Sequence, residues 1–210
     1  MSWEDKRRKL EEGELVLAVG GLEEGEDIWL HEPGQGQLSM EQAMTDGKEW
    51  LENFCLPHLG VTGFDMGECK VSCYLWTFRD VEVGSVEANG ACSYWTFTAM
   101  GGGMEAELLL SAQSGQVLYA SVSCGVPVAS QDAKEMKVFL EDYVASFGLE
   151  GKGEAVQEPG LIYKAVGDGE LSAVIRPFRV VSSKVNPDTN TLEHMETFNI
   201  RIYLARNFTT

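Results

Sequence analysis

The sequence predicts an α+β protein made of two tandem units, each a helix packed on a small antiparallel β-meander. The first observation is a short internal repeat: the segment KEWLENF at 48–54 resembles KVFLEDY at 137–143, with aromatic, leucine and acidic positions in the same order. The second is a change of period, because after each of these segments the apolar residues pass from helical spacing to alternation. A helix followed by strands, used twice, predicts this fold class.

Length and composition set the domain plan. At 210 residues with 44% hydrophobic residues, the chain suits one large domain or two domains of about 100 residues each. We expect an N-terminal segment at 1–37, a first unit at 38–127 and a second unit at 128–210. In the N-terminal segment, residues 1–14 predict a short charged helix, and 14–20 and 28–30 predict short strands.

The charge excludes some classes of partner. Lys and Arg total 16 against 33 Asp and Glu, a formal net charge of -17. Such a field repels phosphate backbones and anionic lipid surfaces, so we expect no nucleic-acid partner. No segment reaches the roughly 18 apolar residues that span a bilayer, and no signal-peptide pattern is present, so we expect no membrane insertion.

The first unit begins with a capped helix. Ser39 has the position of an N-cap, and Gln42 completes a capping box. We expect the helix to end near Cys55, since Pro57 cannot continue it. Alternation and turn residues then predict four strands, at 70–76, 93–98, 106–112 and 116–124, with turns at 89–90, 101–103 and 114–115.

The second unit follows the same plan. Ser130 is the expected N-cap of a helix that ends at Gly148. Strands are expected at 155–156, 161–166, 171–181 and 197–205, with turns at 168–169 and 186–190. In the last strand, Phe198, Ile200, Ile202 and Leu204 face one way, whereas Arg201 and Tyr203 face the other.

The capped helix SMEQAMTDGKEWLENF and the later turn LLLSAQSGQVLYAS together resemble the PepSY-like and cystatin-like repeats of bacterial cell-envelope proteins. The resemblance covers about residues 38–205. It implies a non-catalytic module that regulates or inhibits partners such as peptidases or signalling proteins. It also favours an extracytoplasmic location over a cytoplasmic one, and it supplies no catalytic residues to transfer.

The sequence carries no enzyme signature. The three histidines, His31, His58 and His194, lie in separate segments, and there is no HExxH, GxSxG or P-loop motif. The glycines at 101–103 lack a following Lys-Ser or Lys-Thr, so they predict a hairpin turn and not a phosphate cradle. Glu105 and Glu107 alternate with apolar neighbours and are expected to face solvent. We therefore predict no catalytic residue, cofactor or metal.

The cysteines leave three alternatives open. The five thiols belong to Cys55, Cys69, Cys73, Cys92 and Cys124. Buried free thiols are favoured over one disulfide, such as Cys92 with a cysteine of a neighbouring strand, and over a metal site. Cys69 and Cys73 in one strand would stand roughly 13 Å apart, too far for a direct disulfide or shared zinc ligation.

Aromatic residues are the candidate binding surface. Tyr74, Trp76, Tyr94 and Trp95 crowd two strands that are expected to be neighbours. They fit a core with cross-strand pairs, and they also fit an exposed platform for a peptide, a glycan or another apolar ligand. Exposure away from the helix would favour binding.

Two functional hypotheses follow. The first is a non-enzymatic interaction or regulatory module whose edge strands, or the groove between the units, contact a protein partner. The alternative is a small-molecule or peptide binding protein with a pocket between helix and sheet. A hydrolase ranks third, because it would need folding to bring a histidine beside a cysteine or serine.

Overall fold

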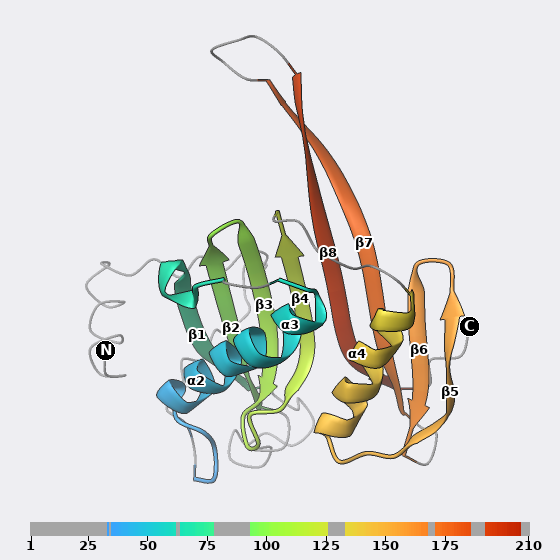
Figure 1. The fold of residues 1–210 in the computed structure, drawn as a ribbon. Helices are drawn as coiled ribbons and strands as arrows, with labels where there is room; N and C mark the ends of the chain where they lie inside the picture. The colour runs from blue at the N-terminus through green and yellow to red at the C-terminus, as the bar shows by residue number, and fades with distance from the viewer. Residues whose placement is uncertain are drawn as a thin grey trace, which may run out of the picture.

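The computed structural model describes residues 33, 35–61, 64–77, 93–125, 133–167, 171–185 and 192–206. Within these ranges, eight antiparallel strands form one sheet in the order β1-β2-β3-β4-β8-β7-β6-β5 (Figure 1). The strands are β1 (Lys70–Thr77), β2 (Ser93–Gly101), β3 (Met104–Ser111), β4 (Val117–Cys124), β5 (Gly151–Glu158), β6 (Leu161–Val166), β7 (Leu171–Val185) and β8 (Leu192–Arg206).

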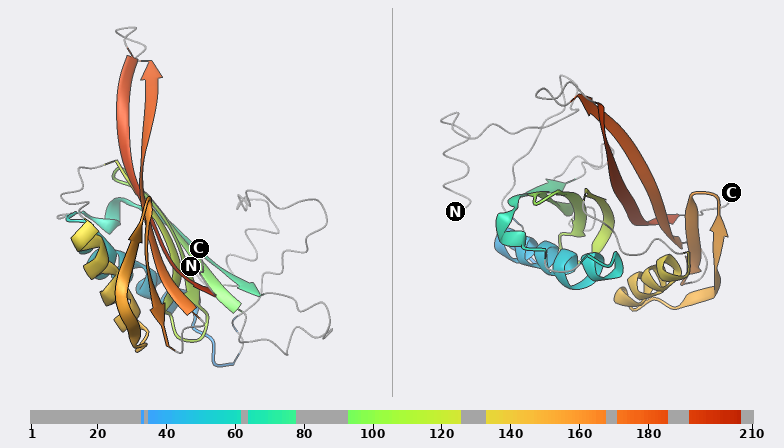
Figure 2. Two further views of the ribbon diagram at one scale, coloured as in Figure 1. Left: turned by 90° about the vertical axis from the view of Figure 1, so that its right-hand side faces the viewer. Right: turned by 45° about the horizontal axis from the view of Figure 1, so that its top comes forward.

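The helices of the described part lie on one face of this sheet (Figures 1 and 2). They are α2 (Met40–Trp50), the π-helical turn η1 (Leu51–Cys55), α3 (Leu56–His58), the short 3₁₀ turn η2 (Met66–Glu68) and α4 (Ala133–Ser146). No described helix is long and apolar enough to cross a membrane. The elements predicted within 1–32, the turns at 89–90, 168–169 and 186–190, and the cap at Ser130 lie outside the described residues.

The prediction of two separate helix-on-meander units is wrong. β4 pairs with β8 from Tyr119↔Tyr203 to Cys124↔Phe198, so both sets of strands belong to one sheet over one continuous core. The α+β class itself is confirmed. Turn signals and alternation determine local hairpins, but the β4–β8 pairing joins residues far apart in the chain, and no local pattern encodes it.

The first helix starts as predicted and ends later. The amide of Gln42 donates to Ser39 Oγ, and the amide of Ser39 donates to Gln42 Oε1, which is the expected capping box. The helical path then continues through η1 to His58, three residues beyond the predicted end at Cys55. Pro57 therefore lies within the last turn of this path, in α3, and does not end the helix before it.

The turn at 101–103 is a hairpin, as predicted. Gly102 and Gly103 join β2 to β3 with φ values of +57° and +80°. A two-residue turn with positive φ at both positions matches the twist of the flanking strands, and glycine adopts it without strain.

β7 and β8 are longer than predicted and form a projecting hairpin (Figure 1). β6 pairs with β7 only as far as Ile175, and β4 pairs with β8 only from Phe198. We call residues 176–185 of β7 together with 192–197 of β8 the arm. Among the described residues, no strand pairs with the outer side of either arm strand.

α2 packs closely on the sheet at Gly47. A Cβ atom at this position would lie 2.7 Å from Cγ of Phe97, whose ring is fully buried in β2. Only glycine allows this approach of helix and sheet, because a planar ring beneath a packed helix has no free space to move into.

Replacing Gly47 with alanine is therefore expected to lower the free energy of unfolding by about 1–2 kcal/mol, through overpacking against Phe97. At an exposed helical position the same change would raise it by about 1 kcal/mol. Urea denaturation measures the sign, and Glu49→Ala, at an exposed position of the same helix, is the control. A stabilised Gly47→Ala variant would contradict the close packing.

Candidate functional site

The face of the sheet away from the helices carries polar and aromatic side chains. Alternate residues such as Ala106, Leu108, Val122 and Ile200 point to the helices and are buried in the core. The residues between them point to the other face, which we call the open face. Strand register arranges them in cross-strand rows: Thr98, Glu107, Ser121, Arg201 and Arg176; Glu105, Ser123, Asn199 and Phe178; Leu109, Tyr119, Tyr203, Val174 and Tyr163.

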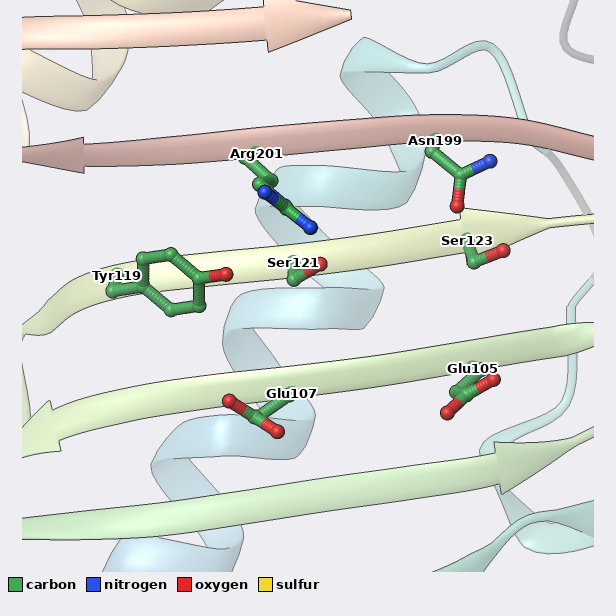
Figure 3. Close-up of a pocket in the computed structure, with 7 residues that line it drawn as sticks. All are labelled: Glu105, Glu107, Tyr119, Ser121, Ser123, Asn199 and Arg201. Carbon is green, nitrogen blue, oxygen red and sulfur yellow. The ribbon is translucent and has the colours of Figure 1, made fainter. Parts of the chain in front are cut away.

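A hollow lies in the middle of the open face (Figure 3). Its volume is about 390 Å³, and it is lined by Glu105, Glu107, Tyr119, Ser121, Ser123, Asn199 and Arg201. The two serines of β4 form its floor, because their short side chains stand between longer ones on β3 and β8. The hollow therefore arises where two serines of β4 stand between larger polar residues of β3 and β8.

The two walls of the hollow carry opposite charges. Glu105 and Glu107 stand on β3, and Arg201 extends from β8 toward Ser121 (Figure 3). Glu107 and Arg201 are two strands apart, roughly 10 Å between their Cα atoms. In the described structure neither carboxylate makes an ion pair, and the guanidinium of Arg201 lies over the Phe178 ring at 5.4 Å. Opposite charges thus face each other without touching.

The aromatic residues that were predicted to form a binding surface lie on opposite faces of the sheet. Tyr74 and Tyr94 lie on the open face and are partly buried. Burial raises the pKa of Tyr94, and the neighbouring Tyr74 and Glu107 add to this effect. The backbone of Trp76 pairs with Tyr94, but its side chain lies outside the described part of the structure.

Trp95 requires a correction. Its side chain is 0% exposed, beneath the helices, and the indole N–H donates to the carbonyl oxygen of Leu38 at 3.2 Å. Adjacent residues of a strand point to opposite faces, so Tyr94 and Trp95 cannot share one surface. Trp95 belongs to the core.

Sequence reasoning missed most of the hollow. It placed Glu105 and Glu107 toward solvent, as the structure does, but it did not bring Ser121, Ser123 or Arg201 to them. The only available signal was the polar face of the last strand. That face becomes part of a site only through the β4–β8 pairing.

His58 links two helices. Its Nδ1 lies 2.7 Å from the carbonyl oxygen of Phe54, and its Nε2 lies 2.8 Å from Oδ2 of Asp142 on α4. The imidazole also stacks on Phe139, with ring centroids 4.7 Å apart. Both ring nitrogens are engaged, so this histidine is not positioned to activate a cysteine or serine.

None of the four described cysteines is in a disulfide: Cys55, Cys69, Cys73 and Cys124. Burial raises the pKa of Cys124 to about 11 and that of Cys55 well above its usual value. Thiols in such surroundings stay protonated and are poor nucleophiles. Cys92 lies outside the described residues. In the described ranges, no group of three or more His, Cys, Asp or Glu residues could hold a metal ion.

No protein-family model, curated protein or solved structure matches this chain. The likeness to PepSY-like and cystatin-like repeats therefore stays a resemblance of short motifs. Two features of the geometry remain as candidates for function: the arm, whose outer edges pair with no described strand, and the hollow of the open face.

Proposed function

We propose that this chain is a non-enzymatic interaction module that binds a protein partner along the β7 edge of the arm. The observation that carries this proposal is a strand edge with which no described strand pairs: β7 runs to Val185, whereas its pairing with β6 stops at Ile175. An edge of this kind presents backbone N–H and C=O groups that another strand can pair with.

Exposed apolar side chains mark the same edge. Phe178, Val180 and Val181 are 38%, 45% and 65% exposed, within four consecutive residues. Exposed clusters of this kind are typical of interaction sites. A two-stranded ribbon is only marginally stable in water by itself, so an added strand would also stabilise the arm.

The edge also defines the form of the partner. Pro177 has no N–H to donate, which fits the place where pairing with β6 stops. Pairing by a partner would therefore run beyond Pro177, toward the tip of the arm. Phe178 and Val180 point to one face, so the partner is an extended segment with apolar residues at alternate positions.

Other features support a module without catalysis. The ring nitrogens of His58 are engaged by Phe54 and Asp142, and the pKa of the buried Cys55 and Cys124 thiols is raised. The resemblance to PepSY-like repeats supports a regulatory role and an extracytoplasmic location. A strand-binding arm fits such a role, since main-chain pairing gives affinity and side chains give selectivity.

Truncation of the arm tests this proposal. Replacing residues 180–197 with Asn-Gly would close a two-residue hairpin between Arg179 and Phe198, which face each other in the register. We expect the free energy of unfolding to change by less than about 1 kcal/mol, because none of the described residues in the removed stretch belongs to the buried core. Peptides selected from a phage-displayed library on the wild-type protein should lose at least about tenfold in affinity.

A point variant with a matched control sharpens the test. Val180→Lys places a charge on the arm, and Val156→Lys places the same charge at a strand position with the same 45% exposure, on β5. Only Val180→Lys should weaken the selected peptides. Peptides that bind the truncated protein as tightly as the wild type would overturn the proposal.

A further inference from the structure

We propose that the hollow of the open face binds a dipeptide-sized zwitterion. The Glu105 and Glu107 carboxylates would hold its ammonium group, and Arg201 would hold its carboxylate. This site is separate from the partner-binding edge of the arm: the seven described lining residues remain when residues 180–197 are removed.

The first support is the separation of charge. One cross-strand row of the open face contains Glu107 on β3, Ser121 on β4 and Arg201 on β8, with the serine in the middle. Because Ser121 is short, nothing in the described structure joins the carboxylate to the guanidinium across it. Both charges are left available for a ligand that carries the opposite charge at each end.

The second support is size. Two residues of extended peptide measure about 7 Å. The Cα atoms of Glu107 and Arg201 are roughly 10 Å apart, two strand spacings. A dipeptide lying across β4 can therefore reach both walls, and a volume of about 390 Å³ accommodates it.

The third support is the polar lining between the walls. The hydroxyls of Ser121, Ser123 and Tyr119 and the amide of Asn199 all line the hollow (Figure 3). The three hydroxyls can donate to and accept from the peptide bond of a ligand. The amide nitrogen of Asn199 already donates to the carbonyl oxygen of Thr197 at 3.2 Å, and its Oδ1 can accept from the ligand. None of the described lining residues is aliphatic, so recognition would depend on the two ends and the peptide bond and not on apolar side chains.

The charge of the whole chain argues against an anionic ligand. At a net charge of -17, the long-range field repels anions and attracts cations. A cation alone would leave the guanidinium of Arg201 unmatched. A zwitterion has no net charge for the field of the protein to repel. It can pair with the carboxylates of one wall and with the guanidinium of the other, so we favour it over an anion or a cation.

The test is a titration of the ¹⁵N-labelled full chain with glycylglycine at low ionic strength, followed by amide chemical shifts. We expect saturable shifts at the lining residues of β3, β4 and β8, with a Kd in the range of about 1–10 mM. N-acetylglycylglycine, which lacks the ammonium, and glycylglycinamide, which lacks the carboxylate, should each bind at least about tenfold more weakly.

Charge-removing variants locate the two ends. Glu107→Gln should weaken the binding of glycylglycine at least about fivefold but leave the weak binding of N-acetylglycylglycine unchanged. Arg201→Gln should also weaken the binding of glycylglycine at least about fivefold, but it should leave the weak binding of glycylglycinamide unchanged. Glu154→Gln, on the distant strand β5, is the control and should change nothing. The arm-truncated protein should bind glycylglycine as tightly as the wild type does. The dipeptide proposal and the partner-binding proposal can therefore be disproved independently of each other.

Three results would overturn the proposal. One is the absence of saturable shifts up to about 50 mM glycylglycine. The second is binding of either capped analogue as tightly as glycylglycine, which would mean that only one wall of the hollow contributes to the binding of the ligand. The third is saturable shifts that map away from β3, β4 and β8.

Discussion

Trp95→Ala is expected to lower the free energy of unfolding by about 3–5 kcal/mol, the usual range for removing a large aromatic side chain from a core. The indole is 0% exposed, and its N–H donates to the Leu38 carbonyl, which ties the segment before α2 to the sheet. The variant would leave a large cavity and an unpaired carbonyl. Urea denaturation of the purified variant gives the value.

The neighbouring aromatics provide the contrast. Tyr74→Ala and Tyr94→Ala change side chains on the open face, which are only partly buried, so each should cost less than about 1.5 kcal/mol. Trp95→Phe keeps most of the packing but loses the hydrogen bond to Leu38, and an intermediate loss of about 1–3 kcal/mol is expected. Equal losses at Trp95 and Tyr94 would contradict the assignment of the two residues to opposite faces.

The local elements of this fold could be predicted because their causes are local. The Ser39–Gln42 capping box sits within four residues, and the glycines at 102 and 103 have the conformation that a tight hairpin requires. In β8, alternation correctly placed Ile200 and Ile202 on the buried face and Arg201 on the other. Each of these inferences used only residues that are close in the chain.

The joining of the strands into one sheet could not be predicted in this way. Each helix and the strands after it suggest a self-contained unit, and nothing in the pattern of β4 marks β8 as its neighbour. The pairing of Ser121 with Arg201 comes from tertiary packing under one continuous core. The hollow depends on this pairing, so it could not be predicted either.

Alternation alone also left the aromatic residues undecided. It required Tyr94 and Trp95 to point in opposite directions, but it did not say which face the helices cover. The structure settles this through α2, which packs over Phe97 at Gly47 and so places the odd-numbered residues of β2 in the core. One close helix–sheet contact therefore determines which aromatic residues can belong to a binding surface.

The contact between α4 and β6 is held by an asymmetric ion pair. The Lys164 side chain lies on the helix-facing side of β6, and its ammonium donates to Oε1 of Glu141 on α4 at 2.6 Å. The lysine side chain is 10% exposed, whereas the glutamate is 44% exposed. Gly151 on β5 gives the lysine its room, because a Cβ there would lie 2.1 Å from Cε of Lys164.

This asymmetry predicts unequal effects of removing the two partners. Glu141→Ala leaves a buried ammonium without its carboxylate, and we expect a loss of about 2–3 kcal/mol in the free energy of unfolding. Lys164→Met fills the same space with an apolar chain and leaves the glutamate in contact with water. Its effect should therefore stay within about 1 kcal/mol of zero.

The double variant separates this account from a simple surface ion pair. Once methionine occupies position 164, Glu141→Ala should have almost no further effect, since no buried charge remains to be compensated. The double variant should therefore be more stable than Glu141→Ala alone. Urea denaturation of the wild type, the two single variants and the double variant gives the four free energies of unfolding that this comparison needs. Equal losses of free energy of unfolding in the two single variants would show that solvent screens both charges alike.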